Sequence, residues 1–221
     1  MKITKKRVVL FLLFIFPLIC FLILSTGKNN FTKLPVLTKN VIDISAIKPS
    51  KTFKDHISVV CFLGDNIEVN KAGFFNLNEK IYKSFIDYKQ FQIIAVYPKE
   101  KEVQVAVLKK EIGAFTDMAK WNFIAADKEE IKILFSSFKT NENLANLYTS
   151  KAFLIDKNGN LRGRTNDKDS TIYGKLFGYN MQSVAELNAK LKDDIKVLYY
   201  EYYAAFKNKN ENKADRKEVG L

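Results

Sequence analysis

Short apolar runs alternate with amphipathic segments along most of this chain. Runs typical of buried strands lie at 57–63, 91–97, 121–125 and 152–155. Between and after them, apolar residues recur every three or four positions, which predicts amphipathic helices. The expected apolar faces are Phe74, Leu77, Ile81, Phe85 and Tyr88; Val103, Ala106 and Val107; Ile131, Leu134, Phe135 and Phe138; and Val184, Leu187, Leu191, Ile195, Leu198 and Tyr202.

Capping residues mark several helix ends. Asp127 and Ser183 each precede a predicted helix, and Glu130 and Glu186 follow three positions later, which is the spacing of a capping box. Gly113 can end the helix that contains Val103, because glycine adopts the left-handed conformation of a C-terminal cap.

A hairpin is predicted at 151–164, KAFLIDKNGNLRGR. Asn158 and Gly159 both tolerate positive φ, so together they predict a tight two-residue turn. The strand that begins at Leu161 is expected to be a half-exposed edge strand, with Arg162 and Arg164 on the face opposite Leu161.

The order of elements predicts an α/β fold. Strands separated by helices imply parallel crossovers, and the terminal hairpin adds antiparallel strands. This is the arrangement of a thioredoxin-like fold, a central mixed sheet flanked by helices, with an insertion. We expect a cytoplasmic basic flank at 1–7, a transmembrane anchor at 8–25, a tether that leads into the domain at 26–54, the thioredoxin-like domain at 55–206, and a charged flexible tail at 207–221.

The anchor is predicted from the uncharged run Val8 to Leu24 after a basic start. As a helix it rises about 26 Å, close to the hydrocarbon thickness of roughly 30 Å. The positive flank would keep the N-terminus in the cytoplasm of a bacterial cell and place the domain in the periplasm, as a single-pass inner-membrane protein. The alternative is a cleaved signal peptide with Ser25-Thr26-Gly27 as a loose cleavage site. Lipidation at Cys20 is disfavoured because Ile19 is large.

Charge excludes few functions. The net charge is +12, and it falls to +8 without the four basic residues of 1–7. Such a surplus can favour anionic headgroups or an acidic partner protein. A surface rich in lysine and asparagine is the preferred explanation, because no basic cluster exceeds a few residues. No helix-turn-helix, zinc-finger or RNA-binding signature is present, so we expect no nucleic acid partner.

Candidate reactive residues are few. Of the two cysteines, Cys20 lies in the apolar run, so Cys61 alone belongs to the domain and cannot close an internal disulfide. Cys61 and His56 should point to opposite faces of one strand, so they cannot share a metal ion unless the strand bends. Cys61 is interpreted as a small core residue, and His56, at the entry to the strand, as a surface residue. We therefore name no catalytic residue, metal ligand or cofactor.

Three polar groups are candidate sites. Asp156 to Gly159 resembles the start of a calcium loop, but its glycine comes too early and Asp167 stands where Glu is expected, which favours a turn. Adjacent helix residues diverge by about 100°, so Asp193 and Asp194 are expected on a solvated face. The last group could be a polar recognition patch or ordinary charges that protect an edge strand, and it comprises Arg162, Arg164, Asp167 and Asp169.

Four segments, in order, resemble the Sco/SenC family of membrane-anchored thioredoxin-fold proteins: VVCFLG from Val59, IAVYPKEKEVQVAVLKKEIG, WNFIAADKEEIKILFSSF, and SKAFLIDKNGNLRGR with the closing helix. The resemblance covers roughly Leu34 to Tyr203. It implies a role in assembling the copper centre of cytochrome c oxidase, through copper transfer or thiol reduction.

This chain departs from the family at its functional residues. The family pattern places CxxxC after the first core strand and a histidine before the hairpin, but here these stretches read GDNIEVNKAG (64–73) and LYTS (147–150). Copper needs soft thiolate and imidazole ligands, and both are absent there. The resemblance therefore suggests a non-catalytic member that acts through protein contacts in respiratory or envelope assembly. The alternatives are a thiol-dependent reductase or copper chaperone that uses Cys61, and a structural envelope protein unrelated to the oxidase.

Overall fold

The computed structural model describes residues 5–25, 33–169 and 174–218, without side chains at 7–8, 24–25 and 206–218. It contains two compact units, Met1–Thr32 and Lys33–Leu221. The first unit holds one helix, α1 (Lys5–Ser25), which includes Pro17. In the part of the chain that the structure describes, no helix is both long enough and apolar enough to cross a membrane. The helix expected at 8–25 is therefore confirmed, and its crossing of a membrane is not.

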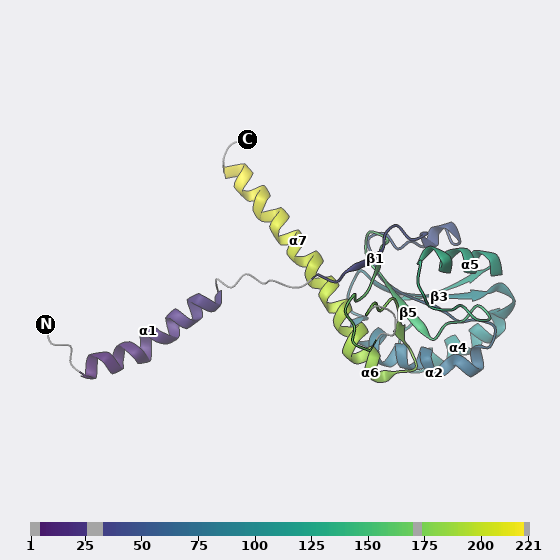
Figure 1. Cartoon of the computed structure of the whole chain (residues 1–221), viewed down its shortest axis with the longest axis horizontal. Coiled ribbons are helices and arrows are strands. Elements are labelled where there is room, and N and C mark those ends of the chain that lie inside the picture. The colour runs from purple at the N-terminus through teal and green to yellow at the C-terminus, as the bar shows by residue number, and fades with distance from the viewer. Residues whose placement is uncertain (1–4, 26–32, 170–173, 219–221) are drawn as a thin grey trace. The chain divides into compact units, whose positions relative to one another are not determined.

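The second unit is built on a seven-stranded mixed sheet (Figure 1). The path of hydrogen-bonded neighbours runs β1-β6-β5-β2-β3-β4, and β7 pairs with β5. Strands β2, β3 and β4 are parallel, whereas β5 is antiparallel to β2, β6 and β7. The bounds are β1 Val36–Thr38, β2 Ile57–Phe62, β3 Phe91–Pro98, β4 Trp121–Ala126, β5 Lys151–Ile155, β6 Leu161–Arg162 and β7 Tyr179–Asn180.

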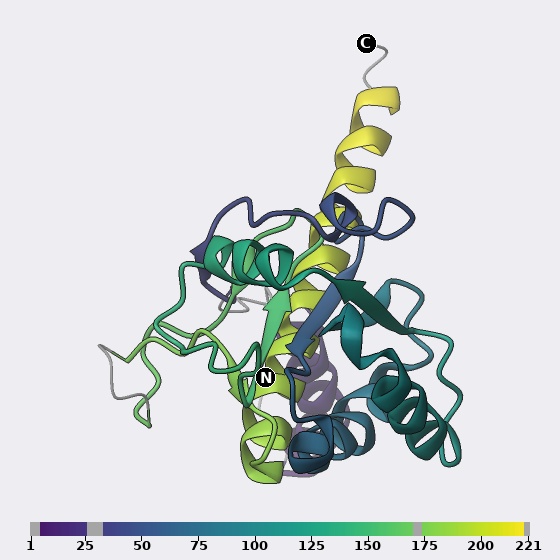
Figure 2. The same cartoon turned by 90° about the vertical axis from the view of Figure 1, so that its right-hand side faces the viewer.

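Helices cover both faces of the sheet (Figures 1 and 2). On one face, α2 (Ile67–Leu77), α3 (Lys83–Phe85), α4 (Glu102–Gly113) and α7 (Lys192–Glu218) contribute to a core that includes Cys61 and Ala95. The short helix α6 (Val184–Glu186) has no buried residue. On the other face, α5 (Lys128–Ser137) packs over Phe62 and Phe153. Four short helical segments complete the unit. Two are 3-10 helices, η1 (Ile44–Ala46) and η3 (Lys99–Lys101), and two are π-helical segments, η2 (Asn78–Tyr82) and η4 (Leu187–Leu191).

The arrangement confirms the predicted thioredoxin-like fold. A parallel β2-α2-β3 unit is joined to the antiparallel β5-β6 hairpin, and the closing helix α7 lies on the same face as α2. Strand β4 and helix α5 form the expected insertion, with β4 parallel to β3 at the end of the sheet. Both faces of β2 and β3 are buried, which explains their continuous apolar sequences.

Residues 33–54, expected as part of a tether, pack onto the folded unit. Strand β1 pairs with β6, and Leu34, Val41, Ile44 and Phe53 are buried. At the other end, α7 remains helical to Glu218, through most of the tail expected from 207. The N-terminal boundary could not be read from the sequence, because it depends on long-range packing.

The hairpin needs a correction. Of the two residues predicted to have positive φ, Gly159 does (+72°) and Asn158 does not. The Gly159 N–H donates to the Asp156 carbonyl at 3.0 Å, and the Asp156 N–H donates to the Asn160 carbonyl at 2.9 Å. The loop is therefore three residues long, with the left-handed glycine last, and not a two-residue turn. Moreover, β1 covers β6, so β6 is not an edge strand.

The helix starts are confirmed, with two changes of detail. Asp127 and Glu130 form the capping box. Ser183 accepts from the Glu186 N–H at 3.1 Å, but the Glu186 carboxylate accepts from the Asn180 N–H instead of closing a box. The apolar face predicted for α4 is wrong: Val103 is 75% exposed, and the buried side chains are Val105, Leu108 and Ile112.

Candidate functional site

Two loops meet where the family pattern would place its reactive residues. Gly64 follows β2 and Tyr148 precedes β5, and the two segments are joined by an isolated bridge between Leu63 and Tyr148. The Asp65 N–H also donates to the Asn146 carbonyl at 3.1 Å. Gly64 has φ +70°, and a Cβ placed on it would lie only 2.4 Å from the Tyr148 Cβ. Tyr148 therefore packs directly against Gly64, two residues after the end of β2.

This junction does not fit a copper ion. The stretches 64–73 and 147–150 contain no cysteine and no histidine. Its polar side chains are carboxylate, amide, hydroxyl, phenol and ammonium groups. Copper in such sites needs soft thiolate or imidazole ligands. Among the described residues, no group of three or more His, Cys, Asp or Glu side chains lies close enough to hold a metal ion.

Cys61 does not supply a reactive thiol to this junction. It sits within β2 opposite Ala95 of β3 and is 0% exposed. Burial raises the pKa of the Cys61 thiol well above its ordinary value, so the thiolate that would attack a disulfide or bind copper is strongly disfavoured. The interpretation of Cys61 as a core residue is confirmed.

His56 lies at the start of β2, away from Cys61 along the strand. The side chain is partly exposed, and Nδ1 is 2.9 Å from the Lys54 carbonyl oxygen. The only histidine of the chain is thus engaged with its own local backbone, and it does not join Cys61 in a site.

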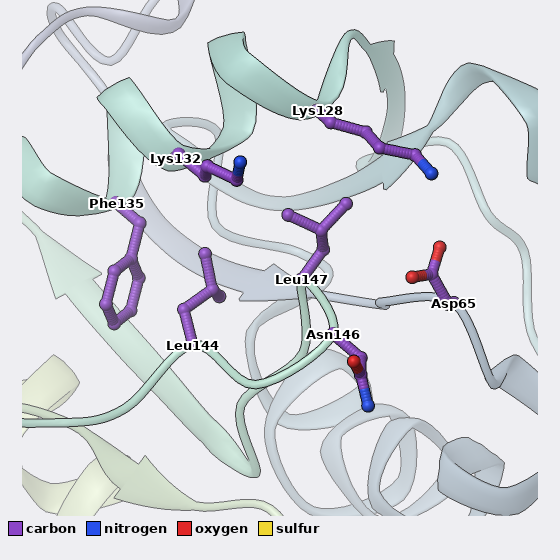
Figure 3. Close-up of a pocket in the computed structure, with 7 residues that line it drawn as sticks. All are labelled: Asp65, Lys128, Lys132, Phe135, Leu144, Asn146 and Leu147. Carbon is purple, nitrogen blue, oxygen red and sulfur yellow. The ribbon is translucent and has the colours of Figure 1, made fainter.

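A pocket of about 420 Å³ opens beside the junction. We call it the Lys128 pocket; its lining residues are Asp65, Lys128, Lys132, Phe135, Leu144, Asn146 and Leu147. Figure 3 shows the two lysines on α5 above Leu147, with Phe135 and Leu144 at one end and Asp65 at the other. The pocket therefore combines two ammonium groups with an apolar floor and a single carboxylate.

The loop beside this pocket has an unusual backbone. Asn146 and Leu147 are consecutive and have φ +50° and +59°. Asparagine tolerates this region, but leucine rarely adopts it, because its Cβ approaches the following carbonyl. The strained conformation turns the chain so that Leu147, which is 6% exposed, packs under α5.

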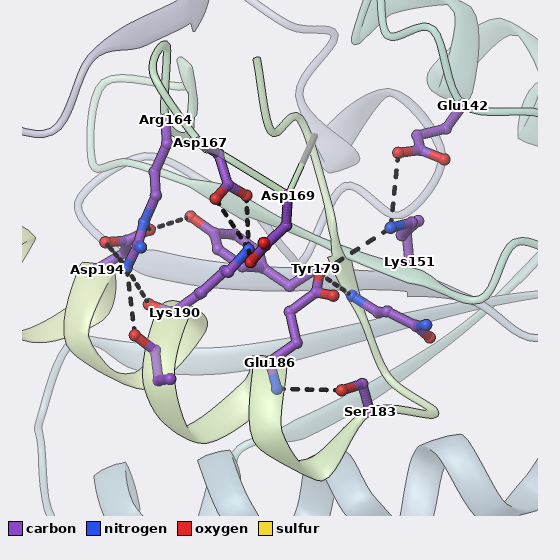
Figure 4. Close-up of polar contacts among 12 residues, drawn as sticks. Glu142, Lys151, Arg164, Asp167, Asp169, Tyr179, Ser183, Glu186, Lys190 and Asp194 are labelled. Atoms are coloured by element: carbon purple, nitrogen blue, oxygen red, sulfur yellow. Dashed lines mark hydrogen bonds and ion pairs between the residues drawn. The ribbon is translucent and has the colours of Figure 1, made fainter. Parts of the chain in front are cut away.

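The arginine and aspartate candidates form ion pairs within the domain instead of a recognition patch, and Figure 4 shows those of Arg164, Asp167 and Asp169. Arg164 Nε contacts Asp194 Oδ2 at 2.8 Å, and Lys190 contacts both Asp167 and Asp169. Arg162 pairs with Glu201 and lies 3.4 Å from Asp156. These contacts attach β6 and the loop after it to the closing helix.

Asp194 was expected on a solvated face, and that expectation is wrong. It is 4% exposed, and Oδ2 accepts from the Tyr179 hydroxyl at 2.6 Å. Burial first, and then the nearby Asp194 charge, raise the pKa of Tyr179 well above its ordinary value. Its neighbour Asp193 is exposed and pairs with Lys196, as a surface residue would.

The resemblance of Asp156 to a calcium ligand is explained by the turn. Asp156 Oδ1 accepts from the N–H groups of Asn158 and Asn160, both at 2.9 Å. Aspartate commonly organises turns in this way. Asp167, the proposed closing ligand, is bound to Lys190.

Sequence reasoning did not find the Lys128 pocket. One signal was available: Lys128, Lys132 and Phe135 have the i, i+4, i+7 spacing of one helical stripe. This stripe lies beside the buried face of α5, which consists of Ile131, Leu134 and Phe138. The other half of the pocket comes from residues that only the fold brings close.

Comparisons with known proteins show similar structures but no family. No protein-family model matches the chain, and no curated protein matches it. Among solved structures it is similar to a SCO1/SenC family lipoprotein from Bacillus anthracis str. Ames, with 15% identity, a TM-score of 0.44, and coverage of 78% of this chain and 99% of that one.

Two further structures illustrate the range of the likeness. BsSco, a member of the Sco family of cytochrome c oxidase assembly proteins, has 15% identity and a TM-score of 0.44, over 74% of this chain and 94% of that one. A thiol:disulfide interchange protein from Bacteroides sp. has 19% identity and a TM-score of 0.36, over 59% of this chain and 79% of that one. Likenesses as low as these say nothing of what this chain binds or does.

Proposed function

We propose that this protein is a Sco/SenC-like member of the thioredoxin-like proteins that has no copper or thiol chemistry. It acts through protein contacts, either in assembly of a respiratory complex (cytochrome c oxidase) or in assembly of the envelope. The observation that carries the proposal is the junction of Gly64 and Tyr148. The sequence on both sides resembles the family in order and content, yet the junction presents packed, non-thiol side chains. A fold retained without its reactive groups favours a binding role.

The reductase or copper-chaperone alternative has weak support. It depends on Cys61, whose side chain is fully buried and whose pKa is raised by that burial. A chaperone would need its thiolate at the surface to exchange a metal or a disulfide with a partner. The second alternative is a purely structural envelope protein with no link to the oxidase.

The proposed location is the bacterial inner membrane, with the domain in the periplasm. Its support is the sequence: the uncharged run Val8 to Leu24 follows Lys5, Lys6 and Arg7. Alkaline carbonate extraction of membranes should leave the full chain in the pellet. Release by osmotic shock, with a mature N-terminus near Lys28, would contradict a retained anchor.

The functional proposal is tested in a strain that lacks this gene. Cytochrome c oxidase activity should fall, and both the wild-type chain and the Cys61→Ser variant should restore it at equal protein levels. The purified full-length chain should lose Cu(I) to a competing chelator. Restoration by the wild type alone, or equimolar Cu(I) retained against the chelator, would favour the alternative that uses Cys61. Normal oxidase activity in the deletion strain would reject the oxidase role.

A further inference from the structure

We propose that the Lys128 pocket binds an acidic peptide segment of a partner protein, with a carboxylate at Lys128 and Lys132 and an adjacent apolar side chain on the floor of the pocket. This inference rests on the proposed function only in assuming that the protein acts by contact with another protein. It adds which surface makes the contact and what chemistry the partner presents.

The two lysines supply the positive end of the pocket. They lie one helical turn apart on α5, and their side chains are 53% and 57% exposed. Lys128 is 4.0 Å from Glu100, and Lys132 is 2.6 Å from Glu129. These carboxylates are themselves 62% and 75% exposed, and exposed pairs of this kind contribute little. A peptide carboxylate can therefore share or replace them at small cost.

The floor of the pocket is apolar and firmly held. The Phe135 ring packs edge-on against Phe62 at 5.4 Å and against Phe153 at 5.8 Å, measured between ring centroids. Leu147 is buried against the same core, and Leu144 is partly buried beside it. Because these side chains are fixed by the sheet below, an incoming apolar side chain gains burial without ordering the floor first.

Asp65 gives the pocket a direction. It lies at the end opposite Phe135 and Leu144 (Figure 3), and its backbone N–H is held by the Asn146 carbonyl. A peptide carboxylate near Asp65 would be repelled, whereas a backbone N–H or a basic side chain would be accepted. The favoured segment thus has its acidic residue toward α5.

Charge complementarity and shape select a peptide over other anionic partners. Nucleic acids and anionic membranes are bound by extended basic surfaces, and this pocket offers two lysines and one opposing carboxylate. A concave space of about 420 Å³ with an apolar floor suits a side chain, and not a flat polyanion. The net positive charge of the chain would assist the approach of an acidic partner.

The test uses the purified full-length chain and a fluorescein-labelled, acetylated eight-residue peptide in which Asp alternates with Leu and Phe. Fluorescence anisotropy should show saturable binding that weakens as salt is raised, since exposed charges are screened. Binding should weaken about tenfold in the Lys128→Glu, Lys132→Glu double variant, and also in Leu144→Ser to a smaller extent.

A matched control changes the same charge elsewhere. Lys83 and Lys196 are exposed helical lysines that pair with Glu79 and Asp193 of their own helices, as Lys132 does with Glu129. The Lys83→Glu, Lys196→Glu variant should bind the peptide like the wild type. Circular dichroism and thermal unfolding of each variant establish that the fold is kept, so that lost binding is not lost structure.

Three results would overturn the inference: equal binding by the Lys128/Lys132 variant and the wild type, equal binding of a peptide with Lys in place of Asp, or an equal loss in the control variant. Photocrosslinking in cells separates the two proposals. If the wild-type chain captures no protein, the contact function itself fails. If both the wild type and the Lys128/Lys132 variant capture one partner equally, only the assigned surface fails.

Discussion

At the scale of single residues, two glycines of similar backbone conformation differ in how much room they leave for a side chain. Gly64 and Gly159 have nearly the same backbone angle, φ +70° and +72°. Their surroundings differ completely: a Cβ on Gly159 would meet nothing within 4 Å, whereas a Cβ on Gly64 would meet Tyr148 at 2.4 Å and the Asn146 carbonyl oxygen at 3.0 Å. The pair separates backbone strain from steric exclusion.

The Gly159→Ala variant should lose about 1–2 kcal/mol of unfolding free energy, the cost of left-handed backbone for a residue with a Cβ. The Gly64→Ala variant should lose at least about 3 kcal/mol, because overpacking adds to the same strain. Urea denaturation of both variants measures the difference. Equal losses at the two positions would show that Tyr148 does not press on Gly64.

Residue-scale features were predicted from the sequence where they depend on local chemistry. The positive φ of Gly159, the Asp127 cap and the burial of Cys61 all follow from neighbours along the chain. The exposure assigned to Asp194 was wrong because Arg164 and Tyr179 reach it from other segments. A buried acid with distant partners looks in sequence like a surface acid.

At the scale of elements, the junction of β6 with α7 depends on a buried arginine. The Arg162 side chain is 9% exposed and pairs with Glu201 of α7, whose side chain is 12% exposed. Asp156, 3% exposed, lies 3.4 Å from Arg162 Nε, and that nitrogen has no hydrogen-bond partner among the described residues. Glu201 also accepts from the Leu34 N–H, so one carboxylate joins the N-terminal segment, β6 and α7.

Replacing Arg162 with Met should cost about 3–5 kcal/mol of unfolding free energy, because two carboxylates would remain largely buried without their cation. The Lys99→Met variant serves as the control. Its ion pair with Asp127 is 53% and 63% exposed, so its loss should cost no more than about 1 kcal/mol. Similar unfolding midpoints for the two variants would contradict a structural role for the buried pair.

Periodicity predicted the elements better than it predicted their orientation. The continuous apolar runs of β2, β3 and β5 were clear because both of their faces are buried. Helix α4 has two apolar stripes, and periodicity predicted burial of the one with Val103 and Val107. The sheet is in fact covered by Val105, Leu108 and Ile112. Which stripe is buried depends on the packing of the helix, and that is not encoded locally.

At the scale of the whole molecule, the buried acids of the domain make its stability sensitive to alkali. Burial raises the pKa of Cys61 above its ordinary 9.0 and that of Tyr179 well above 10.0. A raised folded-state pKa contributes fully to stability below the unfolded-state pKa. The contribution is lost as pH rises further, because the unfolded chain releases a proton that the folded chain retains.

The unfolding free energy should therefore begin to fall near pH 9, where the thiol of the unfolded chain ionises. The Cys61→Ala variant should lack this component, so the difference between the two proteins should change by about 1.4 kcal/mol per pH unit above pH 9. Tyr179 and the other tyrosines are common to both proteins and cancel. Guanidinium titrations from pH 7 to pH 10 measure this difference, and parallel curves would show that Cys61 is not buried as described.

The Lys128 pocket was beyond the reach of sequence reasoning because it exists only in the assembled molecule. It draws on the loop after β2, on α5 and on the segment before β5, and the first of these is separated from the other two by tens of residues. The fold class was predictable, since alternating strands and helices permit few topologies. A pocket between three such segments depends on their contacts, and no local pattern specifies those.

The two π-helical segments, η2 and η4, contact each other on the sheet face that α2 and α7 cover. A π-helical segment contains one more residue than the α-helical turn that it replaces. In an ordinary helix, deleting one residue rotates everything that follows by about 100° and displaces the buried stripe. Here the helices can lose a residue within η2 or η4 and keep both flanking stripes in phase. Insertions and deletions among relatives of this protein should therefore concentrate at 78–82 and 187–191. At these two π-helical segments the helices can change in length during evolution without loss of the core.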